Sequence, residues 1–323
     1  EADGAFVRSF GEEVLTERAH GLTIDAEDFV YTVDDGDHTV RVEYFEGFGD
    51  ASALVSWALR GTGGVVRLNS GGPGYADSQN NFWEPDASAT GGLVSEESQP
   101  IWNTVDDQLY VNERAGAFSY NIPVSNGNHV VRLHFAELFF SSAGVRRFDV
   151  TIEGEKRMTS FDIYGEARKA ALVTKSFTTS VTDGMLTIQF SKVFDNASIQ
   201  AIDVYPAATS VDLVAPTFAP IPEPENATYT TSPTVSLAIA DDRGLDDGYW
   251  RINDDIPQPL FEANTGAGHS GQFTLPIEVF NALPLGSHVL SIGVNDDYGN
   301  ASVQTWRFRK LLSGSGSAPI ASH

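Results

Sequence analysis

Apolar and polar residues alternate with a period of two along most of this chain, and Gly, Asn and Asp separate the alternating runs. The clearest runs are HTVRVEYFE (38–46), ALVSWAL (53–59), VVRLHFAELFF (130–140), RFDVTIEG (147–154), MLTIQFS (185–191) and HVLSIGVND (288–296). A period of two puts alternate side chains on one face, so each run predicts a strand with one buried face. Helical patterns are limited to 12–19 and, more weakly, 277–283. We therefore expect an all-β fold of tandem β-sandwiches.

Two breaks in this pattern predict the domain boundaries. RGTGG (60–64) separates two groups of strands. The Pro-rich stretch at 214–233 indicates an extended spacer, because proline fixes φ and resists helix formation. The predicted units are a partial β domain at 1–60, a sandwich at 64–207, a linker with strand entry at 208–233, a second sandwich at 234–312 and a linker-like tail at 313–323.

The charge balance excludes some classes of binding partner. The chain carries 44 Asp and Glu against 20 Lys and Arg, a formal net charge of −24. Nucleic acids and anionic membranes bind clustered cations, so neither is expected as a partner. A diffuse acidic surface with few Lys is typical of halophile proteins, and equally of ordinary acidic secreted proteins. No apolar run approaches the roughly 20 residues of a membrane span, so no membrane insertion is expected within this segment.

Residue types exclude several chemistries. The chain has no Cys, which rules out disulfides and thiolate sites. Its seven His residues are scattered, and no spacing supports a nucleophile set, a glycosidase carboxylate pair, a phosphate loop or a zinc cluster. His134 and Glu137 are expected to make structural hydrogen bonds. We predict a non-catalytic protein without an organic cofactor. Sequons at Asn196, Asn226 and Asn300 would permit N-glycosylation.

The segment from Val65 to Pro206 carries an ordered series of motifs. They are RLNSGGPGYADSQNNFW (67–83), TGG (90–92), DDQLYVNER (106–114), FSYNIPVSNGNHVVRLHFAELFF (118–140), RRFDVTIEG (146–154), FDIYGEA (161–167) and FDNASIQAIDVYP (194–206). Together they resemble malectin-type domains along their whole length. That resemblance implies a jelly-roll-type sandwich that binds carbohydrate, with a glycan or polysaccharide as partner.

The resemblance also implies a sugar site, part of which is retained. The aromatic pair after the FAE motif falls on Phe139 and Phe140, and the aspartate of the FDN turn falls on Asp195, followed by Asn196. A pyranose stacks its apolar face on a ring and needs fixed polar groups for its hydroxyls. Two family aromatics are missing. Ala115 replaces the one after ER, and Ala89 or Thr90 replaces the one before the TGG turn.

Other interpretations of these residues stay open. Phe139 and Phe140 can equally pack a loop, and Asp195 with Asn196 can simply form an Asx-type turn. Trp83, Trp102 and Tyr75 lie in long loops and are candidates for a replacement stacking surface. Each of these three rings can instead cover the core.

The N-terminal unit suggests self-association. Residues 37–57 resemble the closing hairpin of the protective-antigen-type (PA-fourteen) domain, without the strands that would complete it. An incomplete sandwich leaves a sheet edge that can recruit a strand from a neighbouring copy. Because the sequence begins at Glu1 within what resembles a folded domain, we expect a piece of a longer protein.

The C-terminal unit resembles the immunoglobulin-like modules of bacterial and archaeal surface proteins. The motifs SPTVSLAIADDRGLDDGYWRIND (232–254) and LPLGSHVLSIGVNDDYGNASVQTWRFR (283–309) each end an apolar strand in paired aspartates and a Gly turn. Carboxylates at strand ends can gather on one pole of a sandwich and ligate Ca²⁺, here Asp241, Asp242, Asp296 and Asp297. Without a metal the same residues form good turns. Trp250 and Trp306 follow the apolar period of their strands and are predicted core.

These features leave three functions. We expect a non-catalytic extracellular or cell-surface segment whose carbohydrate-binding module acts in glycan binding or adhesion. The alternative is a structural subunit of an extracellular filament or surface layer, assembled through strand sharing between chains. A third is an accessory region of a polysaccharide-active enzyme.

Overall fold

The computed structural model describes the residues in two compact units, Glu1–Val55 and Ser56–His323. It describes the backbone of 22–24 and 30–32, and residues 64–207, 211–220, 226–261 and 266–312. In the first unit β1 (Leu22–Ile24) pairs antiparallel with β2 (Val30–Thr32). The predicted helix at 12–19, the strands at 38–46 and 53–59, and the protective-antigen resemblance lie outside the described residues, as does the linker-like tail.

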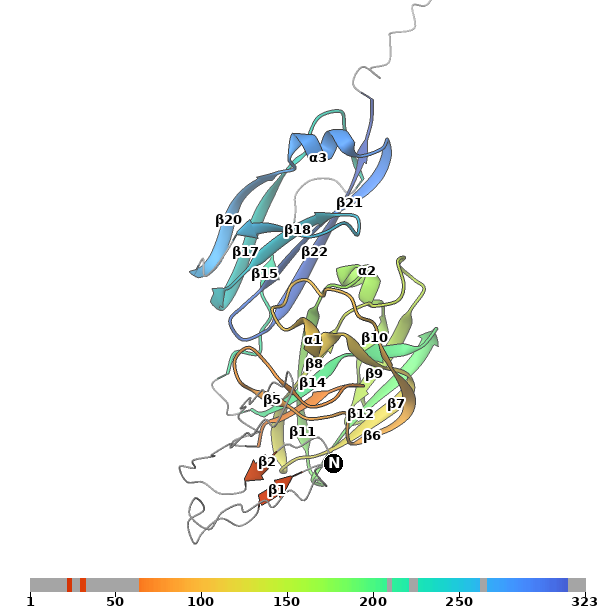
Figure 1. Cartoon of the computed structure of the whole chain (residues 1–323), viewed down its shortest axis with the longest axis vertical. Coiled ribbons are helices and arrows are strands. Elements are labelled where there is room, and N and C mark those ends of the chain that lie inside the picture. The colour runs from red at the N-terminus through yellow and green to blue at the C-terminus, as the bar shows by residue number, and fades with distance from the viewer. Residues whose placement is uncertain are drawn as a thin grey trace, which may run out of the picture. The chain divides into compact units, whose positions relative to one another are not determined.

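Residues 64–207 form the first sandwich, with two facing sheets (Figure 1). One sheet has the order β10 (Glu155–Phe161), β9 (Arg147–Ile152), β12 (Met185–Phe194), β7 (Asn112–Pro123) and β13 (Ala197–Ile199), with β6 (Ala89–Glu96) also paired to β7. The other has the order β11 (Val173–Val181), β8 (Gly127–Phe135), β14 (Ala201–Pro206) and β3 (Val66–Asn69). A short hairpin, β4 (Tyr75–Ala76) and β5 (Phe82–Trp83), and the helices α1 (Asp107–Tyr110) and α2 (Ile163–Ala167) complete it.

Alternation along the strands builds the core of the first sandwich. Phe118, Tyr120 and Ile122 of β7 are buried, while the residues between them are more accessible. Leu186, Ile188 and Phe190 of β12 repeat the pattern and lie opposite them in register. Burying a large apolar side chain contributes roughly 1.5–3 kcal/mol, so the two inner faces hold the sheets together. The all-β prediction is confirmed.

The described residues between 217 and 310 form the second sandwich. One sheet has the order β15 (Thr217–Phe218), β17 (Thr234–Leu245) and β20 (Gly266–Thr274). The other has the order β16 (Ala227–Tyr229), β22 (Ala301–Lys310), β21 (Gly286–Asn295), β18 (Gly248–Ile252) and β19 (Gln258–Phe261), in which β16 runs parallel to β22. The predicted helix is α3 (Ile277–Ala282). Trp250 and Trp306 are buried in the core, as predicted. The immunoglobulin-like resemblance stays a prediction.

One expected strand ends early. The run at 130–140 leaves the sheet after Phe135, and 136–140 form a loop whose backbone is held by an isolated bridge between Glu137 and Lys169. The alternation of the run breaks at this point, because Leu133 to Leu138 are all buried whatever their parity. The loop carries two of the predicted sugar-site residues.

The two sandwiches share a junction, defined here by the residues that bond across it. Its hydrogen bonds join Arg132 Nη1 to Asn300 Oδ1 (2.7 Å) and Tyr298 O (2.9 Å), Asn103 Nδ2 to Ser302 O (3.1 Å), Ala301 N to Thr174 Oγ1 (3.1 Å) and Arg251 Nη2 to Lys169 O (2.6 Å). The Arg251 guanidinium also lies 4.3 Å from the ring centroid of Trp102. Buried polar pairs of this kind fix one geometry, since breaking any of them leaves a desolvated group.

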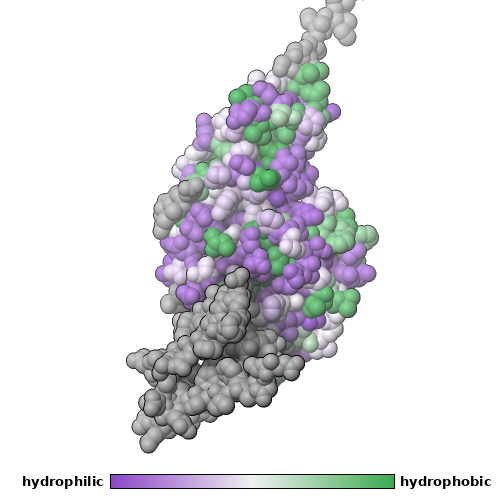
Figure 2. Space-filling model, viewed as in Figure 1, coloured by the Kyte–Doolittle hydropathy of each residue, from purple (hydrophilic) through white to green (hydrophobic). Residues whose placement is uncertain are grey.

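The visible surface is mainly hydrophilic, with small separate hydrophobic patches (Figure 2). That pattern agrees with the strong excess of acidic residues. Within the described ranges, no helix has the length and apolarity that crossing a membrane requires.

Candidate functional site

The loop after β8 presents two aromatic rings. Phe139 is 65% exposed, and Phe140 is partly buried with its ring centroid 5.2 Å from that of Phe139, edge to face. Both backbone N–H groups donate to Oε1 of Glu137, at 3.0 Å each. A fully buried carboxylate therefore fixes the turn that displays the rings.

A buried ion pair connects this loop to the turn that carries Asp195. Arg146 Nε donates to Glu137 Oε2 at 2.7 Å, and Arg146 Nη1 donates to the backbone oxygen of Asn196 at 3.1 Å. The Arg146 guanidinium also covers the ring of Phe140 at 5.1 Å. Asp195 adopts a left-handed φ of 57°, and its carboxylate accepts from the backbone N–H of the next residue, Asn196, at 2.6 Å. Glu137 and Arg146 thus place the three retained sugar-site positions in one connected region.

The positions of the missing aromatics lie on β6 and β7. Leu93 of β6 is directly opposite Ala115 of β7, so their side chains share a face. Leu93 is 78% exposed, and Ala115 leaves its face open. The TGG turn is a bulge in β6 in which Gly91 and Gly92 have φ of 82° and 72°. A Cβ on Gly92 would meet Ala115 O at 2.9 Å, so the turn requires glycine there.

Glu113 of the ER motif connects β7 by hydrogen bonds to the strand and loop beside it. Its carboxylate accepts from Ser198 Oγ at 2.6 Å and from Gln200 Nε2 at 3.4 Å. Gln200 Oε1 in turn accepts from Ala136 N at 2.7 Å, at the start of the aromatic loop. The face of β7 and the loop at 136–140 therefore belong to one hydrogen-bonded frame. We call the exposed part of this frame, Leu93, Ala115, Phe139, Phe140 and Asp195, the aromatic edge.

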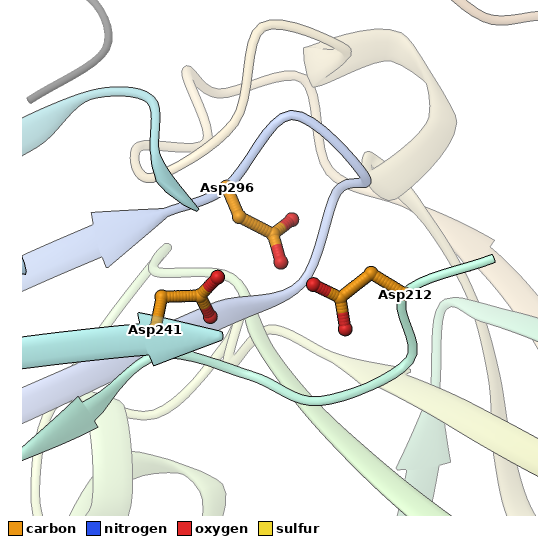
Figure 3. Close-up of side chains that lie close together, drawn as sticks. All are labelled: Asp212, Asp241 and Asp296. Atoms are coloured by element: carbon orange, nitrogen blue, oxygen red, sulfur yellow. The ribbon is translucent and has the colours of Figure 1, made fainter. Parts of the chain in front are cut away.

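A second constellation lies where the linker meets the second sandwich. Asp212, Asp241 and Asp296 each offer a carboxylate oxygen within 4.8 Å of those of the other two, and all three residues are buried (Figure 3). They come from the linker, the distal part of β17 and the turn after β21. We call these three residues the carboxylate cluster. Burial raises the pKa of the Asp296 carboxyl to about 6, with Asp212 adding repulsion, and burial also raises the pKa of Asp212.

The cluster contains one residue from each predicted aspartate pair. Asp242 and Asp297 are exposed and are not among these three residues, so a ligand role for them stays a prediction. Asp241 and Asp242 lie in the irregular part of β17, between Ala240 and Leu245, where the regular pairing with β20 is interrupted. Asp212 was missed because it lies in the linker and nothing in its local sequence indicates a ligand.

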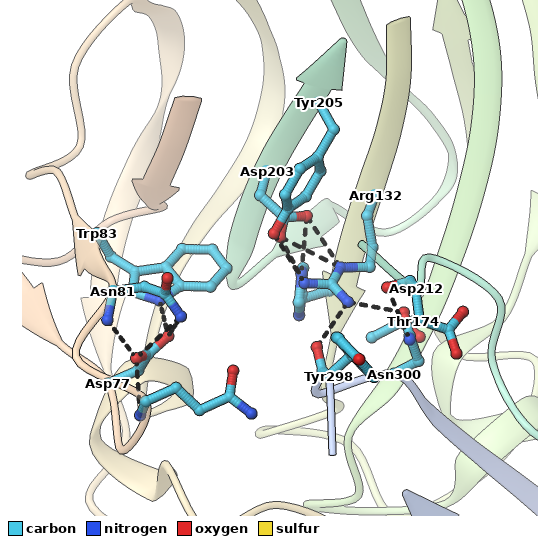
Figure 4. A network of polar contacts seen from close by, with 12 residues as sticks. Asp77, Asn81, Trp83, Arg132, Thr174, Asp203, Tyr205, Asp212, Tyr298 and Asn300 are labelled. Atoms are coloured by element: carbon cyan, nitrogen blue, oxygen red, sulfur yellow. Dashed lines mark hydrogen bonds and ion pairs between the residues drawn. The ribbon is translucent and has the colours of Figure 1, made fainter. Parts of the chain in front are cut away.

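A polar network connects the cluster to the core of the first sandwich (Figure 4). Asp296 Oδ2 accepts from Asn300 Nδ2 at 2.7 Å, and Asn300 Oδ1 accepts from Arg132. Arg132 Nη2 donates to Asp203 Oδ2 at 2.6 Å in a fully buried pair. Burial alone would raise the pKa of Asp203, but Arg132 and His134 hold it well below its usual range. His134 is buried and hydrogen-bonded, in agreement with its expected structural role.

Comparison with known proteins decides the type of the first sandwich. Residues 64–205 match the family described as Malectin domain. These residues form a malectin domain. Human malectin is 29% identical over 133 residues, covering 39% of this chain and 46% of malectin. A probable leucine-rich repeat receptor-like serine/threonine-protein kinase of Arabidopsis thaliana is 32% identical over 180 residues, covering 48% of this chain and 18% of the kinase.

Among solved structures, the ANX1 ectodomain of Arabidopsis thaliana aligns with a TM-score of 0.41 and 19% identity, over 45% of this chain and 48% of that one. The chain thus spans less than half the length of each of these relatives. The malectin domain is a carbohydrate-binding fold, which confirms the fold-level part of the resemblance.

Two of the three proposed replacement rings are buried in the malectin domain, and the third, Tyr75, is partly buried. Trp83 is 3% exposed and its Nε1 donates to Asp77 Oδ2 at 3.0 Å. Trp102 is buried at the junction beneath Arg251. Tyr75 packs against the core, and its hydroxyl donates to Asp106 at 3.2 Å. The interpretation of Trp83 and Trp102 as stacking surfaces does not fit their burial, because each ring fills space between elements.

Phe194 is an aromatic of the malectin domain that the sequence interpretation missed. It is 53% exposed, immediately precedes Asp195, and lies 5.7 Å from the guanidinium of Arg147. The pattern of burial along β12 indicates this exposed aromatic. Its burial alternates up to Phe190 and then stops, so that Val193 and Phe194 are both exposed.

The three sequons differ in accessibility. Asn196 and Asn226 are exposed. Asn300 is fully buried and its amide is fully engaged by Asp212 O, Asp296 and Arg132. The predicted glycosylation of Asn300 is therefore incompatible with the fold, whereas modification of the other two stays a prediction.

Proposed function

We propose that the malectin domain binds a glycan at the aromatic edge, as a non-catalytic module of an extracellular or cell-surface protein. The observation that carries the proposal is the exposed Phe139 ring held by two N–H bonds to buried Glu137. A turn that is fixed by a buried carboxylate and displays a largely exposed ring favours a stacking role for that ring.

The chemistry of the edge suits a sugar. Phe139 and Leu93 offer apolar surface to the C–H face of a pyranose, and the Asp195 carboxylate can accept from its hydroxyls. Because Ala115 replaces an aromatic of the family, the stacking surface is smaller, and we expect a different or weaker glycan preference from that of malectin.

Binding of the full chain to an array of immobilised oligosaccharides tests the proposal. The expected result is a restricted set of bound glycans, with at least a tenfold loss for Phe139→Ala and for Asp195→Asn. Ile256→Ala is the matched apolar control, since Ile256 is also highly exposed but lies in the second sandwich. Asp183→Asn is the matched acidic control, because Asp183 also caps an exposed turn.

Two outcomes would contradict glycan binding at this edge. One is indifference of the wild-type chain to every glycan while circular dichroism shows an intact fold. The other is equal loss in the test and control variants. If the wild-type chain binds no glycan, the structural-subunit alternative gains support, and negative-stain microscopy of native material would then be expected to show filaments or lattices.

A further inference from the structure

We infer that the carboxylate cluster of Asp212, Asp241 and Asp296 binds one Ca²⁺ ion, which fastens the linker to both sheets of the second sandwich beside the junction. The inference is independent of glycan binding, because it concerns other residues. It rests on three properties of the cluster: its unpartnered oxygens, its lack of an ion pair among the described residues and its donor set.

Two carboxylate oxygens of the cluster lack a partner. Asp212 Oδ2 and Asp241 Oδ2 are buried without a hydrogen bond to any described residue. The other oxygen of each group is occupied, since Asp212 Oδ1 accepts from Val214 N at 3.0 Å and Asp241 Oδ1 from Arg243 N and Gly244 N at 2.9 Å. These bonds fix the rotation of the two carboxylates, and Figure 3 shows all three carboxylates of the cluster turned toward a common space. Buried acceptors are rarely left unsatisfied unless an ion or water is bound.

The charge of the cluster is also not neutralised by any ion pair among the described residues. Among the described residues, Asp212, Asp241 and Asp296 form no ion pair with Lys, Arg or His. They are 4%, 9% and 3% exposed, so water screens them poorly. Buried carboxylates are normally paired or bound to a metal, because desolvated like charges repel strongly. A divalent cation at the centre removes both the repulsion and the unsatisfied oxygens.

The donor set indicates which cation. The three residues supply only carboxylate oxygens, which suit hard cations and not zinc or copper. Ca²⁺–oxygen distances of about 2.3–2.6 Å allow two ligand oxygens up to about 5 Å apart, consistent with oxygens that lie within 4.8 Å of one another. Water and backbone oxygens would complete the six to eight ligands. Asp296 also lines a cavity of about 510 Å³, which offers ions a route to the cluster.

The position of the cluster predicts what the ion does. Asp212 follows the malectin domain in the linker, Asp241 lies on β17 of one sheet, and Asp296 follows β21 of the other. Asp296 positions Asn300, which binds Arg132 in the malectin domain. An ion that holds Asp296 therefore stabilises the junction as well as the second sandwich.

Isothermal titration of the chelator-treated full chain with CaCl₂ tests the inference. We expect one Ca²⁺ per chain, and at least a tenfold loss of affinity for Asp241→Asn. Asp183→Asn is the matched control, because it removes the same charge from an exposed turn of the malectin domain. It should bind Ca²⁺ within twofold of wild type.

A second measurement covers the case in which Asp241→Asn fails to fold. Hydrogen exchange of the wild-type chain with and without Ca²⁺ should show added protection of 296–301 and of 130–134, but none at the aromatic edge. Absence of both binding heat and protection in the wild-type chain at millimolar Ca²⁺ would overturn the inference. So would equal loss in Asp183→Asn.

Discussion

The aromatic edge and the carboxylate cluster use buried acidic residues in opposite ways. At the aromatic edge, Glu137 is paired with Arg146 at 2.7 Å, and the Phe139 ring that it positions is left exposed. In the cluster, three buried carboxylates have no cationic partner among the described residues. The edge is complete without a ligand, so its exposed residues should change binding and leave stability unaltered. The cluster is incomplete without a cation, so its ligand should change stability.

The junction gives the largest expected effect on stability. Arg132→Met leaves Asp203 buried without its main counter-charge and should lower the free energy of unfolding by about 3–5 kcal/mol. Urea denaturation followed by fluorescence measures it. Lys156→Met is the control, since Lys156 forms an exposed pair with Asp149 and should cost at most about 1 kcal/mol. Equal costs would show that the Arg132 pair is not specially stabilising.

The second largest expected effect is the stabilisation by Ca²⁺, which should depend on the carboxylate cluster and not on the aromatic edge. At a free concentration of 100 times its Kd, Ca²⁺ should raise the free energy of unfolding by about 2.7 kcal/mol. Phe139→Ala should keep this gain in full, because distant sites act additively, whereas Asp212→Asn should lose it. Thermal denaturation with and without chelator compares the variants. A gain that disappears in Phe139→Ala would mean that the two regions are coupled.

Glu137→Gln should lower both the free energy of unfolding and the glycan affinity of the aromatic edge. The amide cannot pair with the Arg146 charge, so a loss of about 1–3 kcal/mol is expected, with a weaker glycan signal because the loop loosens. Chemical denaturation and the glycan array measure both effects. Glu155→Gln, at an exposed position, should change neither. Full glycan binding in Glu137→Gln would show that the loop does not depend on this pair.

The smallest expected effect is an increase in glycan affinity. Leu93→Tyr places a ring on the face shared with Ala115 and should strengthen glycan binding by about 0.5–1 kcal/mol, a few-fold in Kd. Stability should change by less than about 0.5 kcal/mol because the position is exposed. Titration with a glycan that the wild-type chain binds measures it. Unchanged affinity would place the sugar away from β6.

Much of the fold followed from local pattern. The runs at 147–154, 185–191 and 288–296 lie in β9, β12 and β21, and the weak helical pattern at 277–283 forms α3. The run at 130–140 was extended too far, because a segment buried on all sides has no period that distinguishes a strand from a loop. Motif order was sufficient to identify the malectin domain, since its glycines and buried charges each meet a local geometric need.

The sequence predicted only some of the residues in the two candidate sites. Phe139, Phe140 and Asp195 were found through their motifs. The exposure of Leu93 and Phe194, by contrast, depends on how β6 and β12 pair with their neighbouring strands. Trp83 and Asn300 had the right chemistry for surface roles, yet packing buries both. Whether a side chain is exposed depends on neighbours from distant segments, which a local pattern does not contain.

By itself, the sequence determined the all-β class, the malectin domain and the two aspartate pairs at strand ends, because each depends on residues close together in the chain. Only the tertiary structure decided which member of each pair is buried, since burial depends on the distant segments that pack against it. It also brought Asp212 from the linker to Asp241 and Asp296. A metal site made of three distant segments exists only when the sheets have packed, because no single segment supplies enough oxygens to hold the ion.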